Sequence, residues 1–243
     1  MCIYRTPLAF CILLGISARG IESTNADEQP LAIDEKTVPD SGWKNLFNGQ
    51  DLSGWTFDVL DGSAPDSIWS VEDGLLTSRG KGKSRGVIRT AGEYSDYELE
   101  FEWRWLGEPG NSGCLIHCSS AREWNVWPKS LEIQLYHGHA GDFVFIGETI
   151  ETPEDQIPTG DIQKWEVRRR YNLTDDSERP AGEWNHMRIR ADSNEVTVHV
   201  NGDLVNRGNK GSAFQGAICL QAEGANLQFR RIRIRSTSTE PQK

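Results

Sequence analysis

The sequence has no apolar run approaching the ~18 residues of a membrane-spanning helix, and no segment of ordinary helix length with amphipathic spacing. Basic residues are also scarce: 26 Lys and Arg stand against 36 Asp and Glu, which gives a formal net charge of −10. Because an acidic surface repels phosphate, this balance argues against nucleic acid as a partner. The length of 243 residues suits one all-β domain of ordinary size.

Cysteine is also rare, and its spacing argues against a disulfide framework. Cys2 and Cys11 lie in the N-terminal segment, which leaves three cysteines in the rest of the chain. Cys114 and Cys118 are four residues apart in an expected strand, so their Cα atoms should be about 13 Å apart, too far for a disulfide. One of them could pair with Cys219 on a neighbouring strand, but we expect three small buried thiols.

The N-terminus has the pattern of a secretory signal peptide. Arg5 precedes a short apolar stretch at residues 8–16, and small residues follow as far as Ala26. We expect a cleavable signal over residues 1–26 and an exported protein, periplasmic or extracellular; the alternative is a buried N-terminal helix. Composition divides the remainder into a polar linker at 27–41, a domain at 42–236 and a tail at 237–243.

Many short segments alternate apolar and polar residues, which is the period of a β-strand. Gly turns such as Asp73-Gly74 and Asn201-Gly202 separate them, and this combination predicts a β-sandwich. A change of register at Arg230-Arg231 predicts a β-bulge, and the polar residues 151–182 predict a long loop over one face. The expected strands are 67–72, 75–78, 86–90, 96–105, 113–118, 131–136, 142–146, 185–191, 195–201, 203–206, 217–221 and 227–234.

The segment Trp127–Asp142 carries the most informative chemistry. Its aliphatic residues at 131, 133 and 135 alternate with Glu132, Gln134 and Tyr136, so the polar side chains should share the face opposite the core. His137 and His139 follow in a glycine-rich turn and can exchange protons near neutral pH. A sheet bearing these groups is typical of a surface that binds a sugar.

Pieces of the chain, taken in order, resemble the 3-keto-disaccharide hydrolase family, also described as a 3-keto-glucoside lyase and hydratase domain. Each piece is common by itself, whereas the ordered set over residues 42–236 is specific; Arg231 departs from the Asn usual there. The resemblance implies a two-sheet antiparallel jelly-roll sandwich, similar to concanavalin A-like lectins and glucanases. The pieces are Gly42-Trp43, Leu46–Gly49, Leu52–Trp55, Trp69–Leu76, Tyr97–Arg104, Gly110–Gly113, Glu132–Gln134, Gly182–Asn185, Val200–Gly202, Leu220–Ala225 and Phe229–Ile232.

The resemblance also implies a reaction. A partner dehydrogenase oxidises the sugar at C3, a base then removes the acidified C2 proton, the C1 substituent leaves, and water adds back. On these residues we expect Glu132 to be the base, Gln134 to donate to the enolate or a sugar hydroxyl, and His137 to shuttle a proton. The alternative for Glu132 is a cross-strand ion pair with an arginine such as Arg104 or Arg188.

A conventional glucanase of the same fold is the enzymatic alternative. Such enzymes resemble one another in a Glu-x-Asp-x-x-Glu strand, whereas this chain has Glu132-Ile-Gln134-Leu-Tyr-His137. An amide and an imidazole replace two carboxylates, which argues against a retaining double displacement. Two non-enzymatic alternatives stay open: a carbohydrate-binding module, and an interaction protein that uses the sandwich only as a scaffold.

Several other residues are candidates for binding the substrate. Trp124 and Trp127 flank the entry to the Glu132 strand and suit stacking on a pyranose; otherwise they anchor a loop. His137, His139 and Asp142 could also ligate a divalent cation, although no cofactor is firmly predicted. The remaining candidates, whose alternative roles are purely structural, are His117, Arg104, Glu102, His139 and Glu223.

Overall fold

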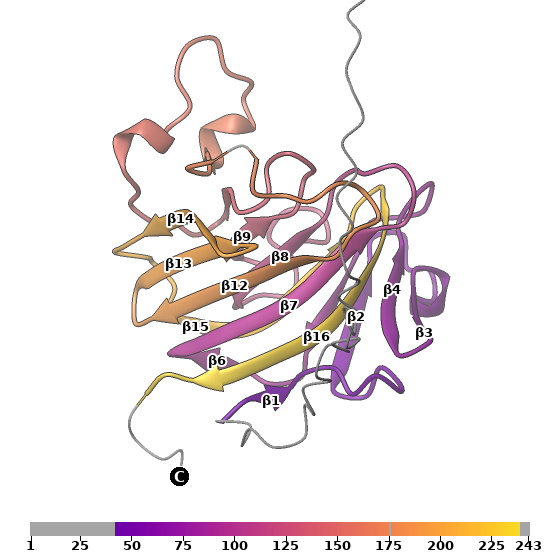
Figure 1. The fold of residues 1–243 in the computed structure, drawn as a ribbon. Coiled ribbons are helices and arrows are strands. Elements are labelled where there is room, and N and C mark those ends of the chain that lie inside the picture. The colour runs from indigo at the N-terminus through magenta and orange to yellow at the C-terminus, as the bar shows by residue number, and fades with distance from the viewer. Residues whose placement is uncertain (1–41, 175, 239–243) are drawn as a thin grey trace, which may run out of the picture. The chain divides into compact units, whose positions relative to one another are not determined.

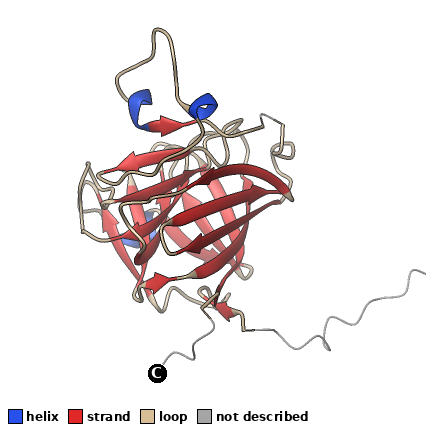
Figure 2. Ribbon diagram, turned by 90° about the vertical axis from the view of Figure 1, so that its left-hand side faces the viewer, coloured by secondary structure: helices blue, strands red, loops and turns tan. Residues whose placement is uncertain are grey.

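The computed structural model describes residues 42–174 and 176–238. The expected signal peptide and linker lie outside these residues, and so does the part of the expected tail at 239–243. Within the described residues, three short 3-10 helices are the helical elements, and none is long and apolar enough to cross a bilayer. Two antiparallel sheets make up the remaining regular structure, as predicted (Figures 1 and 2).

The first layer, called here the β7 sheet, faces the viewer in Figure 1. Its strands lie in the order β14-β13-β12-β7-β16-β4-β3, and β1 pairs with β16. The bounds are β1 Lys44–Asn45, β3 Trp69–Glu72, β4 Leu75–Arg79, β7 Tyr97–Trp105, β12 Asn185–Asp192, β13 Glu195–Val200, β14 Asp203–Gly208 and β16 Asn226–Ser236.

The second layer, the β9 sheet, lies behind the first in Figure 1. Its order is β11-β10-β9-β8-β15-β5-β2, and β6 pairs with β15. The bounds are β2 Trp55–Val59, β5 Gly86–Thr90, β6 Tyr94–Ser95, β8 Gly113–Cys118, β9 Ser130–Gln134, β10 Phe143–Ile146, β11 Arg169–Arg170 and β15 Gln215–Ala222.

The predicted turns and the bulge are present. Asp73 and Gly74 both have positive φ, 51° and 77°, which fits the tight turn that joins β3 to β4. In β16 the pairing with β7 shifts between Arg230 and Arg233, and Arg231 has a φ of 53°. The bulge explains why the apolar positions before and after it are out of phase.

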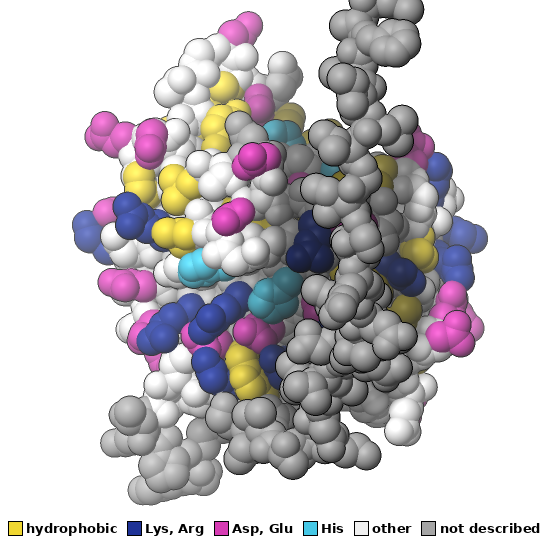
Figure 3. All heavy atoms as spheres, in the orientation of Figure 1, with side chains coloured by type: hydrophobic (Ala, Val, Ile, Leu, Met, Phe, Trp, Pro, Cys, Tyr) yellow, Lys and Arg dark blue, Asp and Glu magenta, His cyan; other side chains and the backbone are white. Residues whose placement is uncertain are grey.

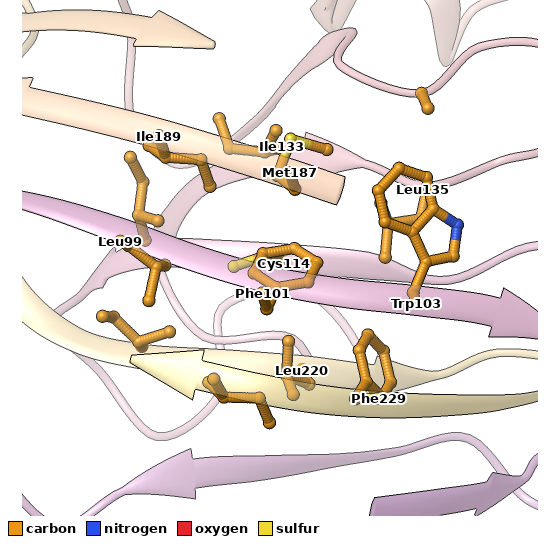
Figure 4. Close-up of a cluster of buried hydrophobic side chains, with 14 of the residues drawn as sticks. Leu99, Phe101, Trp103, Cys114, Ile133, Leu135, Met187, Ile189, Leu220 and Phe229 are labelled. Carbon is orange, nitrogen blue, oxygen red and sulfur yellow. The ribbon is translucent and has the colours of Figure 1, made fainter. Parts of the chain in front are cut away.

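The core lies between the sheets, and alternate residues from both layers fill it. Figure 4 shows Leu99, Phe101 and Trp103 of β7 near Ile133 of β9 and Leu220 of β15. All five are fully buried, which explains the period of two in their strands. Cys114, Cys118 and Cys219 are buried free thiols, as expected.

The polar segment 151–182 forms an excursion at the top left of Figure 1. It is irregular, as predicted, apart from the 3-10 helices η2 (Glu154–Gln156) and η3 (Glu166–Arg168) and the two-residue strand β11. β11 pairs with β10, so the excursion returns to the edge of the β9 sheet. A third 3-10 helix, η1 (Pro65–Ser67), precedes β3.

The outer face of the β7 sheet carries alternating charges. Glu98 and Glu100 of β7 lie between arginines of β12 and β16, and Glu102 lies between His186 of β12 and Arg230 of β16. Glu98, for example, accepts hydrogen bonds from Arg188 and Arg235, each at 2.6 Å. Figure 3 shows basic and acidic side chains intermixed on this face.

Candidate active site

A cavity of about 320 Å³ opens on the outer face of the β9 sheet. Strand β9, the hairpin at residues 123–127, the end of β15 and the 151–182 segment each contribute to its wall. Polar, charged and aromatic side chains meet there, as at a site for a small polar ligand. The lining residues are Asn111, Trp124, Trp127, Glu132, Gln134, Tyr136, Val144, Trp165, Arg168, Arg169 and Glu223.

Glu132 occupies the middle of β9, with Leu115 of β8 on one side and Val144 of β10 on the other. Its neighbours in sequence, Leu131 and Ile133, point into the core, so its carboxyl points into the cavity, where it is only 5% exposed. Burial raises the pKa of Glu132 to about 8, and the charge of Glu223 adds to this rise, although nearby amide and guanidinium groups oppose it. Near neutral pH this carboxyl can both accept and release a proton.

Gly113 makes room beside Glu132. A Cβ at this position of β8 would lie 2.6 Å from Glu132 Oε1 and 2.6 Å from Gln221 Oε1. The side chains of Glu132 and Gln221 therefore both lie over β8 at Gly113, where β8 has no side chain. Gln221 is fully buried, and its side-chain amide lowers the pKa of the neighbouring Glu132 carboxyl.

Gln134 ends β9 with a fixed amide orientation. Its Oε1 accepts hydrogen bonds from the backbone N–H groups of Leu135 and Tyr136, both at 2.9 Å. Because the oxygen is held in this way, the Nε2 donor is the group that Gln134 can offer to a ligand in the cavity.

Glu223 brings a second carboxyl to the same cavity from the end of β15. Burial raises the pKa of Glu223, and Arg85, whose Nε lies 3.3 Å from Glu223 Oε1, opposes this rise. The cavity thus combines two carboxyl groups that are both easier to protonate than usual, the arrangement expected for proton transfer.

Arg168 and Arg169 bring positive charge from the 151–182 segment. Arg169 is buried and pairs through its Nε with the buried carboxylate of Asp142, which also accepts a hydrogen bond from the Asn172 backbone N–H at 2.6 Å. Arg168 lies nearer the rim, where its guanidinium stacks 4.0 Å from the centre of the Trp124 ring.

Aromatic rings form the rim. Trp124, Trp165 and Tyr136 are exposed and line the cavity, with Arg168 stacked on Trp124 and His139 on Tyr136. Trp127 also lines it but is buried, because the hairpin folds it against Leu115 and Cys219. Of the two predicted tryptophans, Trp124 is thus the exposed one and Trp127 the anchor of the hairpin.

The two histidines after β9 lie outside the cavity lining. Half-exposed His137 contacts Glu178, with 3.6 Å between Nδ1 and Oε1. The ring of His139 stacks on Tyr136 with 5.3 Å between centroids, so it supports a rim residue instead of reaching the cavity itself.

His117 also lies outside the cavity lining, for a backbone reason. The pairing of β8 with β15 is irregular between Ala217 and Cys219, and His117 has a φ of 57°. This reverses the alternation, so His117 is buried with its ring 5.8 Å from that of the core residue Tyr97. Burial lowers the pKa of His117 to about 4, so the ring is neutral.

Glu102 and Arg104 lie on the β7 sheet, away from the cavity lining. Glu102 pairs with Arg230 and Arg231, and Arg104 donates to Gln228 Oε1 at 2.8 Å. Alternation along β7 predicted their shared face, but this face belongs to the other layer of the sandwich. The cross-strand partner of Glu132 is likewise neither Arg104 nor Arg188, which pairs with Glu98.

The suggested metal ligands do not converge. No group of three or more His, Cys, Asp and Glu side chains among residues 42–174 and 176–238 is arranged to hold a metal ion. Asp142, one of the three suggested ligands, is engaged by Arg169. These three residues are therefore not arranged to bind a divalent cation together.

Several cavity residues were not among the predicted site residues. Asn111 lies in a segment given above for the family resemblance, and Arg168 and Arg169 lie in the segment predicted to be a long loop over one face. The cluster of one tryptophan and three arginines at 165–170 was the available signal, because such residues are unusual in a loop that is merely solvated.

Comparison with known proteins agrees with this architecture. The family model described as "3-keto-alpha-glucoside-1,2-lyase-like domain" matches residues 42–235. No curated protein matches the chain in sequence.

Solved structures show the same fold. Two candidate glycosyl hydrolases from Parabacteroides distasonis ATCC 8503 are similar to it, at 21% identity with a TM-score of 0.58 and at 25% identity with a TM-score of 0.56. The first match covers 81% of this chain and 94% of that protein, and the second 80% and 98%. The carbohydrate-binding module CBM66 from Bacillus subtilis is also similar, at 12% identity and a TM-score of 0.52 over 75% of this chain and 96% of the module.

Proposed function

Because the chain belongs to the 3-keto-alpha-glucoside-1,2-lyase-like domain family, we propose that it cleaves 3-keto-glycosides by elimination followed by hydration. The observation that carries the proposal is Glu132: a buried carboxyl of raised pKa faces a cavity that also holds a second carboxyl, guanidinium groups and exposed aromatic rings. Such a set can move a proton and stabilise developing charge without a second carboxylate on the same strand.

The proposed cleavage conserves atoms and electrons without an added oxidant. The C3 ketone acidifies the C2 proton, which passes to the Glu132 carboxylate while the electron pair of the C–H bond forms an enolate. The enolate then collapses to a C1–C2 double bond as the C1–O bond breaks, and the departing oxygen takes a proton. Water adds across the double bond, so C1 gains the hydroxyl and C2 regains a proton, and the net change is hydrolysis.

Two further cavity groups have roles in this scheme. Glu223, protonated more readily than an ordinary glutamate, is the acid for the departing oxygen. Gln134 Nε2 is a donor to a sugar hydroxyl, because its oxygen is already held by the backbone. His137, expected from the sequence to shuttle a proton, has no part in this scheme, since it contacts Glu178.

Another enzyme must form the 3-keto substrate. A 3-keto-glycoside is the product of a sugar C3-dehydrogenase, so we place such an enzyme before this one in the reaction sequence. The expected signal peptide at residues 1–26 would place the cleavage of the glycoside outside the cytoplasm.

The test is to incubate the purified protein with a 3-keto-disaccharide and with its unoxidised parent, and to follow the released sugar with and without EDTA. We expect release from the keto sugar alone, insensitivity to EDTA, and loss of at least about 100-fold in Glu132→Gln. Glu100→Gln, which changes a carboxylate on the outer face of the β7 sheet, is the matched control and should keep its activity.

The same assay separates the alternatives. Release from the unoxidised parent would support a conventional glycosidase. Binding of the sugar without release from either substrate, unchanged in Glu132→Gln, would support the carbohydrate-binding module. No affinity for any sugar would support an interaction scaffold, and each of these results would overturn the lyase–hydratase proposal.

A further inference from the structure

Arg169 is a buried cation with an unused donor. Its side chain is about 6% exposed and lines the cavity, and its Nη2 atom has no hydrogen-bond partner among the described residues. A buried donor without a partner is costly for the fold, and a ligand in the cavity would satisfy it. The missing partner must be an acceptor, because a guanidinium only donates.

The other side of the same guanidinium is firmly anchored. Its Nε pairs with the carboxylate of Asp142, which is 1% exposed and also holds the backbone of Asn172. The Arg169 guanidinium carbon lies 5.1 Å from the centre of the Tyr171 ring and 5.6 Å from that of Trp165. Held by these contacts, the guanidinium needs little rearrangement when charge develops near it.

The position of Arg169 relative to Glu132 suits the stabilisation of a negative charge that forms on the substrate. Both residues line the same cavity, and the charge of Arg169 acts on the Glu132 carboxyl. When Glu132 takes a proton from C2, the negative charge leaves the carboxylate and moves to the C3 oxygen of the sugar. A fixed cation on the wall of this cavity stabilises the charge at its destination.

We infer that Arg169 is the oxyanion site of this cavity, a catalytic residue whose free Nη2 donates to the enolate oxygen formed at C3 of a 3-keto sugar. The inference rests on the proposed function and deepens it, because it gives the ketone a specific partner. Asp142 is a positioning residue, since it acts through Arg169. Arg168, whose charge also lowers the pKa of Glu132, differs from Arg169 in that its guanidinium is stacked on Trp124 at the rim.

A second kind of group could place an anionic oxygen beside Arg169. A carboxylate carried by the sugar, as in a 3-keto-uronide, would also satisfy Arg169, but in the ground state. The two cases differ kinetically: an oxyanion site affects kcat, whereas a carboxylate site affects KM for the charged sugar only.

The experiment compares Arg169→Gln, Arg169→Lys and the wild type on a neutral 3-keto-glucoside and on the corresponding 3-keto-uronide. We expect Arg169→Gln to lose about 100- to 1000-fold in kcat on the neutral sugar with KM changed less than about threefold. Exchange of the C2 hydrogen with deuterated solvent should fall in parallel. Millimolar guanidinium should restore part of the activity of Arg169→Ala, which a merely structural role would not allow.

Two controls test whether the Arg169 variants fold and whether the effect is specific to this arginine. Arg170→Gln changes the adjacent guanidinium, which donates to backbone carbonyls and lies outside the cavity lining, so its kinetics should match the wild type. Circular dichroism must show that the Arg169 variants are folded. The pH at which kcat/KM rises should move upward in Arg169→Gln, since the lost positive charge had lowered the pKa of Glu132.

The outcomes are distinct. A rise in KM confined to the uronide, with kcat preserved, would overturn the oxyanion assignment in favour of carboxylate recognition. A folded Arg169→Gln with wild-type kcat would also overturn it while leaving the proposed lyase intact. An inactive wild type would overturn the proposed function itself, and the inference with it.

Discussion

Glu132 affects the stability of the fold as well as the chemistry. Its pKa is about 8 in the folded protein, against 4.5 for an unperturbed glutamate. Between these values the folded protein holds a proton that the unfolded chain has released, so the free energy of unfolding falls as the pH rises through this range. The carboxyl therefore weakens the fold under the conditions in which it becomes a base.

Replacing Glu132 with glutamine should stabilise the protein at alkaline pH. The amide keeps the shape but cannot ionise, so we expect Glu132→Gln to exceed the wild type by about 2–4 kcal/mol above pH 8 and to match it near pH 4. Urea unfolding at several pH values measures this. A variant less stable than the wild type at pH 9 would show that the charged carboxylate is well solvated or paired.

Gly113 should tolerate no larger side chain. In Gly113→Ala the new Cβ would lie 2.6 Å from an oxygen of Glu132 and 2.6 Å from one of Gln221, so one of the two side chains must move. We expect at least tenfold lower activity and a loss of about 1–3 kcal/mol in unfolding free energy. A kinetic assay with thermal unfolding checks both, and unchanged activity would mean that the Glu132 geometry is not critical.

At the residue scale, alternation along β9 was enough to place Glu132 and Gln134 together, because a strand has only two faces. It failed for His117, since the irregular pairing beside Gly216 reverses the strand there. A Cβ at Gly216 would lie 2.4 Å from the backbone carbon of His117, so only glycine allows this approach, yet a glycine alone does not identify a bulge.

Among the elements, the 151–182 segment contributes the groups expected to select the substrate. It brings Trp165, Arg168 and Arg169 to a cavity whose proposed base, Glu132, lies on β9. The length and polarity of the segment predicted a long loop over one face, but not which of its residues line the cavity. The Arg169–Asp142 contact, which joins residues far apart in sequence, depends on the pairing of β11 with β10.

Removal of the Trp165 ring should weaken substrate binding more than catalysis. The ring is half exposed at the rim, where it can stack on a sugar or on the leaving group, so Trp165→Ala should raise KM about five- to tenfold with little change in kcat. Trp184→Ala is the matched control, because Trp184 stacks with Arg104 and Arg230 on the β7 sheet. Equal effects of the two substitutions on KM would contradict a role for Trp165.

Across the whole molecule, the carboxylates of the two sheets respond to pH in opposite ways. Burial raises the pKa values of Glu132 and Glu223 on the β9 side. On the β7 sheet, burial alone would raise the pKa of Glu98, but the hydrogen bonds from Arg188 and Arg235 outweigh it and lower the pKa. Ionisation therefore strengthens one layer of the sandwich and weakens the other.

Glu98→Gln should therefore destabilise the protein at neutral pH. A lowered pKa contributes stability above 4.5 that is lost as the pH falls through the folded value, so the difference from the wild type should be about 1–3 kcal/mol at pH 7 and vanish in strong acid. Denaturant unfolding at both pH values tests this. Glu195→Gln, which changes an exposed carboxylate on β13, should have no effect at either pH.

The two-sheet architecture could be predicted because each strand carries its own period and its own turn. The sheet to which a given polar face belongs could not be predicted, because strand order depends on pairing between distant segments. Glu102 and Arg104 illustrate this limit, since their shared face was predicted but lies on the β7 sheet, opposite the cavity.

The attachment of the 151–182 segment has an evolutionary consequence. The carboxyl groups proposed to transfer protons lie on or beside strands that the core holds in place, whereas Trp165, Arg168 and Arg169 lie on an excursion that pairs with the β9 sheet through the two residues of β11. Insertions and deletions within the excursion would leave the strands unchanged. Descendants of one ancestor could thus acquire new leaving-group preferences by exchanging this piece of chain, while each inherits the same base.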